Sequence, residues 1–347
     1  MKIAQRDIGP GSRPYLIAEM SGNHNQSLAR ALDIVDAAAR AGADAIKLQT
    51  YTADTMTLDV AAPGFVIEDA ESLWEGRRLY DLYQEAHTPW DWHVPIMQRA
   101  ASHGLHCFSS PFDDSAVDFL EELGVPAYKI ASFENTDLPL IRKVARTGKP
   151  LIISTGMASV AEVDEAVRTA RESGCDQIAL LKCTSTYPAT PDNTNIRTIP
   201  NLRETFGCEV GLSDHTMGCG VAVASVAVGA VLIEKHFTLR RADGGVDSSF
   251  SLEPEEFALL RIETERAWQS LGRVTYGGTQ SEEKSRIFRR SLYIGRELKA
   301  GDVLTAENLR IVRPGLGLPP KYYETMLGKR INRDVPAGTP LTWQLLA

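Results

Sequence analysis

Two histidines, His215 and His236, are placed so that they could bind one metal ion. His215 follows one short apolar run and His236 ends another, with Ser213 and Glu234 two residues earlier on the same sides. If the two runs are neighbouring parallel strands, about 4.8 Å apart, both imidazoles can reach the same ion. Two protein ligands leave positions open, so such an ion would be catalytic and would polarise a carbonyl oxygen. Spacing alone leaves a structural role equally open, because a lone histidine is more often a core or surface residue.

Three lysines, Lys47, Lys129 and Lys182, lie at or just inside the ends of other short apolar runs. Hydroxyl residues and freed backbone N–H groups follow them, a combination typical of phosphate or carboxylate binding. The chain has a net charge of −8, so positive charge gathered at one rim would suit a small anionic substrate. Each lysine alone could instead form a structural ion pair with a glutamate, but three at one rim favour a binding site.

A third polar cluster follows the first apolar run and contains Glu19 and His24. Both are candidate acid–base or orienting groups. Part of this polarity has a simpler interpretation, because Ser27 is placed to cap the amino terminus of a helix.

The elements that must position these residues are eight short apolar runs that alternate with longer stretches of helical periodicity, such as 28–41, 160–173 and 257–271. Alternating strands and helices predict a parallel sheet, and polar residues at the strand ends are typical of a (β/α)8 TIM barrel with an active site. The predicted strands are 15–19, 45–49, 105–109, 127–131, 150–154, 177–183, 209–213 and 231–236.

The length of 347 residues exceeds the roughly 250 that one barrel requires. We therefore predict a barrel over 1–271, a linker over 272–290 and a small loop-rich module over 291–347, where glycine and proline interrupt short extended pieces. An amino terminus unlike a signal peptide and five cysteines without a closely spaced pair indicate a cytoplasmic enzyme. No apolar run is long enough for a membrane span, and no basic patch suits nucleic acid.

Taken together, these stretches resemble the sialic acid synthase family, whose barrels condense phosphoenolpyruvate with an acylated amino sugar. The matching segments run in order along the barrel. They are Ala18–Glu19 with Asn23–His24, Lys47–Gln49, Ser110–Phe112, Lys129–Ser132 with Glu134, Ser154–Met157, Leu181–Thr184 with Tyr187–Pro188, Gly211–His215 and Glu234–Phe237.

The resemblance gives these residues specific roles. It implies that His215 and His236 hold Mn²⁺ or Mg²⁺, and it adds Glu134 to Glu19 and His24 as a catalytic candidate. The residues implied around phosphoenolpyruvate are Lys47, Ser110, Lys129, Ser132, Ser154, Lys182, Ser185 and Ser213. Those implied for the sugar are Gln49, Glu134, Tyr187, Asp247, Phe288 and Arg313.

Segments 18–25, 47–59, 79–92 and 288–293 resemble the branch of the family that uses 2,4-diacetamido-2,4,6-trideoxy-L-altrose. The segment 51–90, with Met56, Leu58, Trp74, Tyr80 and Tyr83, is apolar enough to receive a deoxy end and acetyl methyl groups, although loop packing would explain it equally. The alternatives are a synthase for N-acetylneuraminate or legionaminate and, more remotely, a noncatalytic binding protein.

The carboxyl-terminal module resembles the antifreeze-like (SAF) domain of that family, which implies a domain-swapped homodimer with Arg313 near the sugar and Phe288 at the entrance. Two positions depart from the family pattern. Asn25 and Gln26 stand where many neuraminate synthases have glutamate and glycine, so Glu134 or Glu19 would have to orient water. Ser185 stands where asparagine is common.

Overall fold

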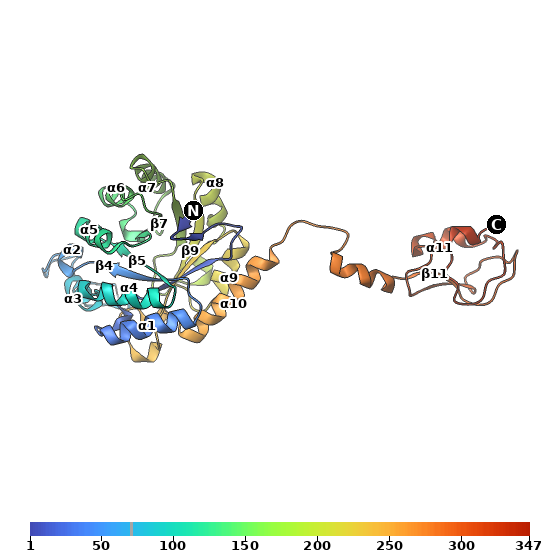
Figure 1. Ribbon diagram of the computed structural model, residues 1–347, viewed down its shortest axis with the longest axis horizontal. Helices are drawn as coiled ribbons and strands as arrows, with labels where there is room; N and C mark the ends of the chain where they lie inside the picture. Colours follow the sequence, from blue (N-terminus) through green and yellow to red (C-terminus); the bar gives the residue numbers. More distant parts are fainter. Residues whose placement is uncertain (70–71) are drawn as a thin grey trace. The chain divides into compact units, whose positions relative to one another are not determined.

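Eight parallel strands form a closed barrel in the computed structural model, which describes residues 1–69 and 72–347 (Figure 1). Each strand pairs with its predecessor in the chain, and β10 closes the barrel against β3. The predicted fold and all eight predicted strands are confirmed, with ends that differ by at most two residues. The strands are β3 (Tyr15–Glu19), β4 (Ala45–Thr50), β5 (His106–Pro111), β6 (Tyr128–Ile130), β7 (Leu151–Ser154), β8 (Ile178–Cys183), β9 (Glu209–Asp214) and β10 (Leu232–His236).

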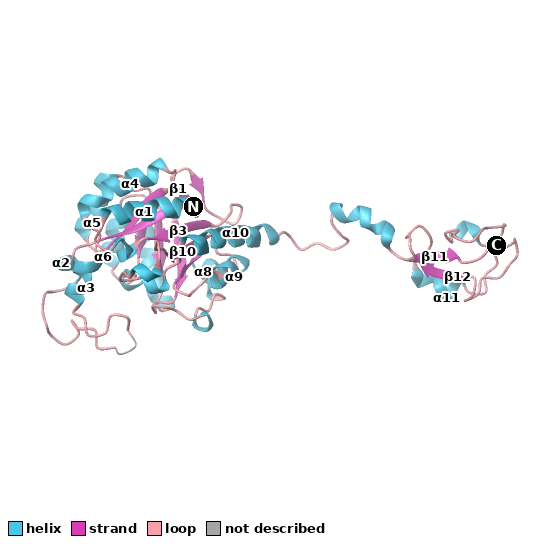
Figure 2. Ribbon diagram, turned by 90° about the horizontal axis from the view of Figure 1, so that it is seen from below, coloured by secondary structure: helices cyan, strands magenta, loops and turns pink. Residues whose placement is uncertain are grey.

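Helices cover the outside of this barrel, so the strands are buried on both faces (Figures 1 and 2). The predicted cap is present, since the Ser27 hydroxyl accepts a hydrogen bond from the Arg30 backbone N–H. Ser159 and Glu162 begin another helix with a reciprocal capping box. The helices are α1 (Leu28–Arg40), α2 (Ala53–Met56), α3 (Leu79–Ala86), α4 (His93–Ser102), α5 (Asp114–Leu123), α6 (Leu138–Ala145), α7 (Val160–Glu172), α8 (Thr198–Phe206), α9 (Gly220–Ala227) and α10 (Pro254–Ser270).

The register of the strands decides which side chains enter the barrel. Residues opposite each other on parallel neighbours face the same way, and the direction reverses at each step along a strand. His236 lies opposite Glu19, and Glu19 lies opposite Lys47, so these three side chains share the interior. On the next strands round the barrel, Glu234 lies opposite Ser213, and Ser213 lies opposite Cys183.

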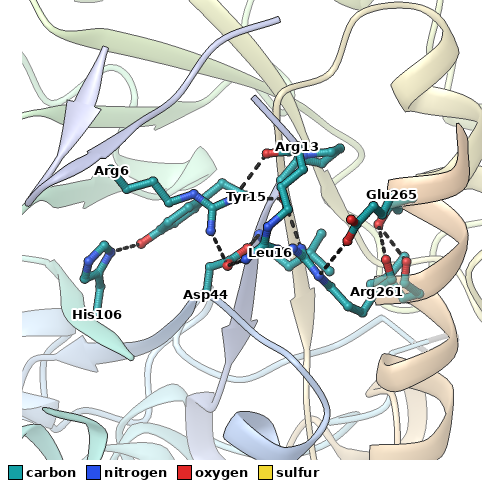
Figure 3. A network of polar contacts seen from close by, with 11 residues as sticks. Arg6, Arg13, Tyr15, Leu16, Asp44, His106, Arg261 and Glu265 are labelled. Carbon is teal, nitrogen blue, oxygen red and sulfur yellow. Dashed lines mark hydrogen bonds and ion pairs between the residues drawn. The ribbon is translucent and has the colours of Figure 1, made fainter. Parts of the chain in front are cut away.

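A short hairpin, β1 (Lys2–Ile3) with β2 (Arg6–Asp7), precedes the barrel, and it brings Arg6 to Asp44. Asp44 precedes β4, at the end of the barrel opposite the strand ends that carry the candidate site residues. Its carboxylate also pairs with Arg13 at 3.0 Å and with Arg261 of α10 at 3.2 Å (Figure 3). The Leu16 backbone N–H donates to the same carboxylate at 2.9 Å. One buried charge therefore joins the hairpin, the first strand and the last helix of the barrel.

The residues 273–347 form a second compact unit, separate from the first unit of residues 1–272. It contains a 3₁₀ helix (η7, Gln280–Phe288), a two-stranded antiparallel sheet of β11 (Ser291–Ile294) and β12 (Leu309–Val312), and a short helix, α11 (Tyr323–Met326). Buried leucines and isoleucines, among them Leu292, Leu309 and Ile331, give it a hydrophobic core of its own. Within the described part of the chain, no helix is long and apolar enough to cross a membrane.

We expect removal of the Asp44 charge to lower the stability of the protein substantially. The Asp44→Asn variant leaves the guanidinium groups of Arg6, Arg13 and Arg261 without their shared counter-charge. We expect the free energy of unfolding, measured by urea denaturation, to fall by about 3–5 kcal/mol.

Asp36→Asn is the matched control, because Asp36 pairs with Arg99 and His103 in a more exposed position. We expect this variant to lose about 1 kcal/mol or less. Equal losses in the two variants would show that the Asp44 network has no special role.

Candidate active site at the carboxyl ends of the barrel strands

Lys47 and two glutamates form the centre of a buried polar cluster. The Lys47 Nζ atom lies 2.8 Å from Glu19 Oε2 and 3.8 Å from Glu234 Oε2. It also donates to the Ser110 hydroxyl at 3.3 Å, while Ser213 donates to Glu234 at 3.1 Å. Burial raises the pKa of Glu19 to about 7 even though the Lys47 charge opposes the shift. The Glu19 carboxyl therefore holds its proton more tightly than an exposed glutamate does.

The imidazoles of His215 and His236 converge beside this cluster, with ring centroids 5.3 Å apart. The Thr184 carbonyl lies 2.9 Å from His215 Nδ1, which fixes the orientation of this ring. His236 Nδ1 is buried without a hydrogen-bond partner among the described residues. Burial, reinforced by the charge of His215, holds the pKa of His236 well below its usual range, so this ring is neutral. Two neighbouring imidazoles, one of which has a buried Nδ1 atom without a partner among the described residues, fit a divalent metal.

Side chains from three other segments surround the histidines. Asp247 Oδ2 lies 3.7 Å from His236 Nδ1 and accepts a hydrogen bond from the Ser21 hydroxyl. Gln49 donates to Ser21 at 3.1 Å and to Glu19 at 2.8 Å. Tyr187 packs on His215 with ring centroids 4.5 Å apart. The described residues contain no group of three or more His, Cys, Asp or Glu side chains arranged around a metal, so other ligands would have to complete the coordination.

A second part of the barrel mouth is basic and rich in hydroxyl groups. Lys129 donates to the Ser154 hydroxyl at 2.6 Å, and the Gly156 backbone N–H donates to the Ser132 hydroxyl at 3.2 Å. Burial lowers the pKa of the Lys129 ammonium, although the charge of Glu234 opposes the shift. Over the described ranges, no carboxylate lies within 4.0 Å of this ammonium group. Lys129 therefore has a positive charge free to meet an anion.

Glu134 follows this basic part in a short 3₁₀ helix, η3 (Ser132–Glu134). Its Oε2 atom is buried and has no hydrogen-bond partner among the residues that are described. Burial raises the pKa of this carboxyl to about 7, and the charge of Lys129 only partly offsets the effect. A carboxyl group with a pKa near 7 suits general acid–base catalysis.

The structure places Lys182 away from the barrel interior, contrary to the expectation of three lysines at one rim. Lys182 lies opposite Leu212 in the β8–β9 ladder, whereas its neighbour Cys183 lies opposite the inward Ser213. The Lys182 ammonium instead contacts the Cys183 carbonyl at 2.7 Å, on the side covered by helices. The prediction for Lys182 is wrong because the inward-facing residue of β8 is its neighbour Cys183, and a shift of one position reverses the side chain's direction.

His24 also lies outside the cluster. Its Nε2 atom is 3.2 Å from the Thr88 hydroxyl, and its ring packs edge-on against Trp92 with centroids 5.5 Å apart. Burial lowers the pKa of His24 to about 4, so the ring is neutral at physiological pH. These contacts fit a structural role in fastening the first loop.

The remaining predicted residues divide between the two units. Ser185 lies beside the cluster, with its hydroxyl 3.7 Å from the Cys183 sulfur. Phe288 and Arg313 belong to the second unit, and their assignment to the sugar stays a prediction.

Several residues that belong to this site escaped the sequence analysis. Glu234 was paired with His236 by spacing but given no role, although it shares Lys47 with Glu19. Ser21 and Asn135 also contribute, the latter by donating to the Ser154 and Gly156 carbonyls at 3.2 Å. Burial raises the pKa of the Cys183 thiol, but His215, the Ser132 hydroxyl and the charge of Lys129 together lower it to about 7. Cys183 lies opposite Ser213 in the β8–β9 ladder, and this register places its thiol inside the barrel.

Part of the predicted sugar-binding segment 51–90 folds onto this end of the barrel. The Trp74 indole donates to the Val246 carbonyl at 3.1 Å, and its ring lies 5.9 Å from that of Tyr187. Trp74 therefore forms an apolar wall near the histidines, whereas Leu58 is 63% exposed. Residues 70 and 71 of this segment lie outside the described residues.

Comparisons with known proteins agree with this geometry. The chain is 42% identical to the pseudaminic acid synthase of Campylobacter jejuni over 94% of this chain and 95% of that protein. It is 35% identical to the N,N'-diacetyllegionaminic acid synthase of Legionella pneumophila, covering 95% of this chain and 94% of that protein. The crystal structure of N-acetylneuraminic acid synthetase from Leptospira borgpetersenii, in complex with citrate, superposes with a TM-score of 0.73 at 31% identity, covering 82% of this chain and 94% of that one.

The expected family relationship is confirmed by two matches within the chain. The NeuB family model matches residues 34–276 and the SAF domain model matches residues 289–347. The chain therefore belongs to the NeuB family and ends in a SAF domain.

Proposed function

We propose that this protein is a pseudaminic acid synthase, which condenses phosphoenolpyruvate with 2,4-diacetamido-2,4,6-trideoxy-L-altrose to give pseudaminic acid and phosphate. The observation that carries the proposal is the 42% identity to a pseudaminic acid synthase over nearly the whole of both chains. The buried cluster around Lys47 and the basic part around Lys129 supply groups that this chemistry needs. The lower identity to a legionaminic acid synthase makes that activity the alternative.

The basic part of the mouth suits phosphoenolpyruvate. Lys129, Ser132 and Ser154 offer an ammonium group and hydroxyl groups without a carboxylate paired to them, as an incoming phosphate or carboxylate requires. Ser110 and Ser213 extend this set toward Lys47. In the proposed reaction, C3 of phosphoenolpyruvate forms a bond to the aldehyde carbon, water adds at C2, and phosphate leaves by cleavage of the C–O bond. Fixed donors stabilise the charges that develop on both partners.

His215 and His236 would hold a divalent metal, which supplies Lewis-acid polarisation of the aldehyde oxygen when it is bound. The available Nδ1 of His236 and the hydrogen bond from His215 Nδ1 to the Thr184 carbonyl fit this role. Asp247, Gln49 and Tyr187 lie around the histidines and would orient the sugar. The apolar ring of Trp74 fits a sugar with a deoxy end and acetyl methyl groups.

We assign the proton transfer at the attacking water to Glu134. Its pKa near 7 lets the carboxylate accept a proton at neutral pH, and it lies in the helix that follows Lys129. Glu19, which is held by Lys47 and Gln49, is the second candidate.

Sugar preference tests the proposed activity directly. Purified enzyme is given phosphoenolpyruvate with 2,4-diacetamido-2,4,6-trideoxy-L-altrose, with N-acetylmannosamine or with the precursor of legionaminic acid, and phosphate release and product mass are recorded. We expect the first sugar to have the highest kcat/KM, because Trp74 favours its apolar groups. Faster turnover of either other sugar would reject the assignment.

If the two histidines hold one metal ion, replacing either of them should weaken metal binding. His215→Ala and His236→Ala should each weaken Mn²⁺ binding, measured by electron paramagnetic resonance, by about 10-fold or more and lower kcat/KM by about 100-fold or more. The control is His103→Ala, because His103 lies on the exposed surface. If the histidine variants bind Mn²⁺ as tightly as the wild type, the ion is held elsewhere.

The raised pKa of Glu134 predicts a pH-dependent stability difference in the ligand-free protein. Because the folded protein holds this proton up to about pH 7 and the unfolded chain only to about 4.5, the wild type loses stability as the pH rises between these values. Glu134→Gln lacks this titrating group and therefore this loss. The free energy of unfolding of the variant minus that of the wild type should increase by up to about 3 kcal/mol as the pH rises from 4.5 to 7. A constant difference across this range would show that Glu134 has an ordinary pKa.

A further inference from the structure

Lys182 has an unbalanced charge on the outer side of β8. Its Nζ atom lies 2.7 Å from the Cys183 carbonyl oxygen and 3.5 Å from the Thr184 hydroxyl. Among the residues of the described chain, no carboxylate lies within 4.0 Å of it. Burial of this partly covered ammonium lowers its pKa, as expected for a cation that has lost water without gaining an anion. The site described above does not use this lysine.

The Lys182 side chain lines a cavity of about 280 Å³ between α7 and α8. Thr198, Asn201 and Thr205 follow one another along a single side of α8, at helical spacing, and supply hydroxyl and amide groups. One side of α7 packs against α6, and the other side of α7 borders this cavity. The lining therefore combines one cation with neutral donors and acceptors.

The opposite wall of the cavity is apolar and open to solvent. Met157 is 66% exposed and Val160 is 69% exposed, although both are large hydrophobic residues. Met157 also has a φ of 64°, in the left-handed region that costs energy for a residue with a side chain. Apolar groups beside a cation, one amide and several hydroxyl groups are typical of a small-molecule site.

We propose that this cavity binds a small acylated sugar acid, with the carboxylate at Lys182, the amide groups at Asn201 and the threonines, and the methyl groups against Met157 and Val160. Pseudaminic acid, the product assigned above, belongs to this class, so the choice of this ligand rests on the proposed function. An inorganic anion would satisfy Lys182 but leave the amide and apolar walls unused.

The cavity is connected to the active site through consecutive carbonyl groups. Lys182 holds the Cys183 carbonyl, and the next carbonyl, that of Thr184, fixes His215. A carboxylate that draws the ammonium group away from Cys183 would disturb the end of β8 without entering the barrel. The ligand would therefore act as an inhibitor that does not compete with phosphoenolpyruvate.

Calorimetry with the full-length enzyme at saturating phosphoenolpyruvate tests the site, because the active site is then occupied. We expect pseudaminic acid to bind with one site per chain, and Lys182→Met to raise its Kd by about 10-fold or more. Asn201→Ala, an exposed position on α8, should raise the Kd by several-fold without endangering the fold. Lys284→Met, which removes the same charge from an exposed position in η7, should bind as the wild type does.

Inhibition kinetics test the cavity independently of the proposed reaction. Pseudaminic acid should inhibit the wild type noncompetitively against phosphoenolpyruvate, and about 10-fold less strongly in Lys182→Met. Absence of binding at saturating phosphoenolpyruvate, an unchanged Kd in Lys182→Met, or equally tight binding of inorganic phosphate would each overturn the cavity assignment. If the enzyme makes no pseudaminic acid from its sugar, the proposed function fails, and the calorimetry still decides whether the cavity accepts this acid.

Discussion

The shared ammonium group of Lys47 is the interaction on which the candidate site depends. It lies between the carboxylates of Glu19 and Glu234, which enter the barrel from β3 and β10, the strands that close it. Without this ammonium, two buried negative charges would face each other in a region closed to solvent. With it, the two carboxylates are fixed in place. Glu19 then accepts a hydrogen bond from Gln49, and Glu234 accepts one from Ser213. The two histidines then lie against a framework that is already fixed.

This arrangement divides the mouth of the barrel by charge. Glu19 on β3 and Glu234 on β10 lie near the two imidazoles, while Lys129 and the Ser154 hydroxyl lie on β6 and β7. A cation and an anion can therefore bind at one end of the same barrel without competing for the same groups. At the opposite end of the barrel, the Asp44 carboxylate pairs with Arg13 and Arg261 and so stabilises the fold (Figure 3). Chemistry and stability are thus separated along the strands, as the fold generally allows.

Much of this architecture could be predicted from the sequence because buried parallel strands leave a strong signal. The run from Tyr15 to Glu19 and the run ending in His236 were located with little error, and the pairing of His215 with His236 followed from adjacent strands. It was harder to predict which side chains of a strand point into the barrel. Lys182 and Cys183 differ by one position, and only the register with Ser213 shows that the thiol enters the barrel. His24 was ambiguous for a related reason, because its partners, Thr88 and Trp92, come from a segment whose path no local pattern reveals.

The central claim is that a metal at the two histidines and phosphoenolpyruvate at Lys129 occupy one barrel mouth together. Crystals of the enzyme soaked with Mn²⁺ and phosphoenolpyruvate, measured by anomalous diffraction, test it most directly. The account predicts an anomalous peak bound by His215 and His236, with the phosphate of phosphoenolpyruvate contacting Lys129 and Ser154. A manganese peak away from both imidazoles, or a phosphate bound outside the barrel beside Lys182, would contradict it.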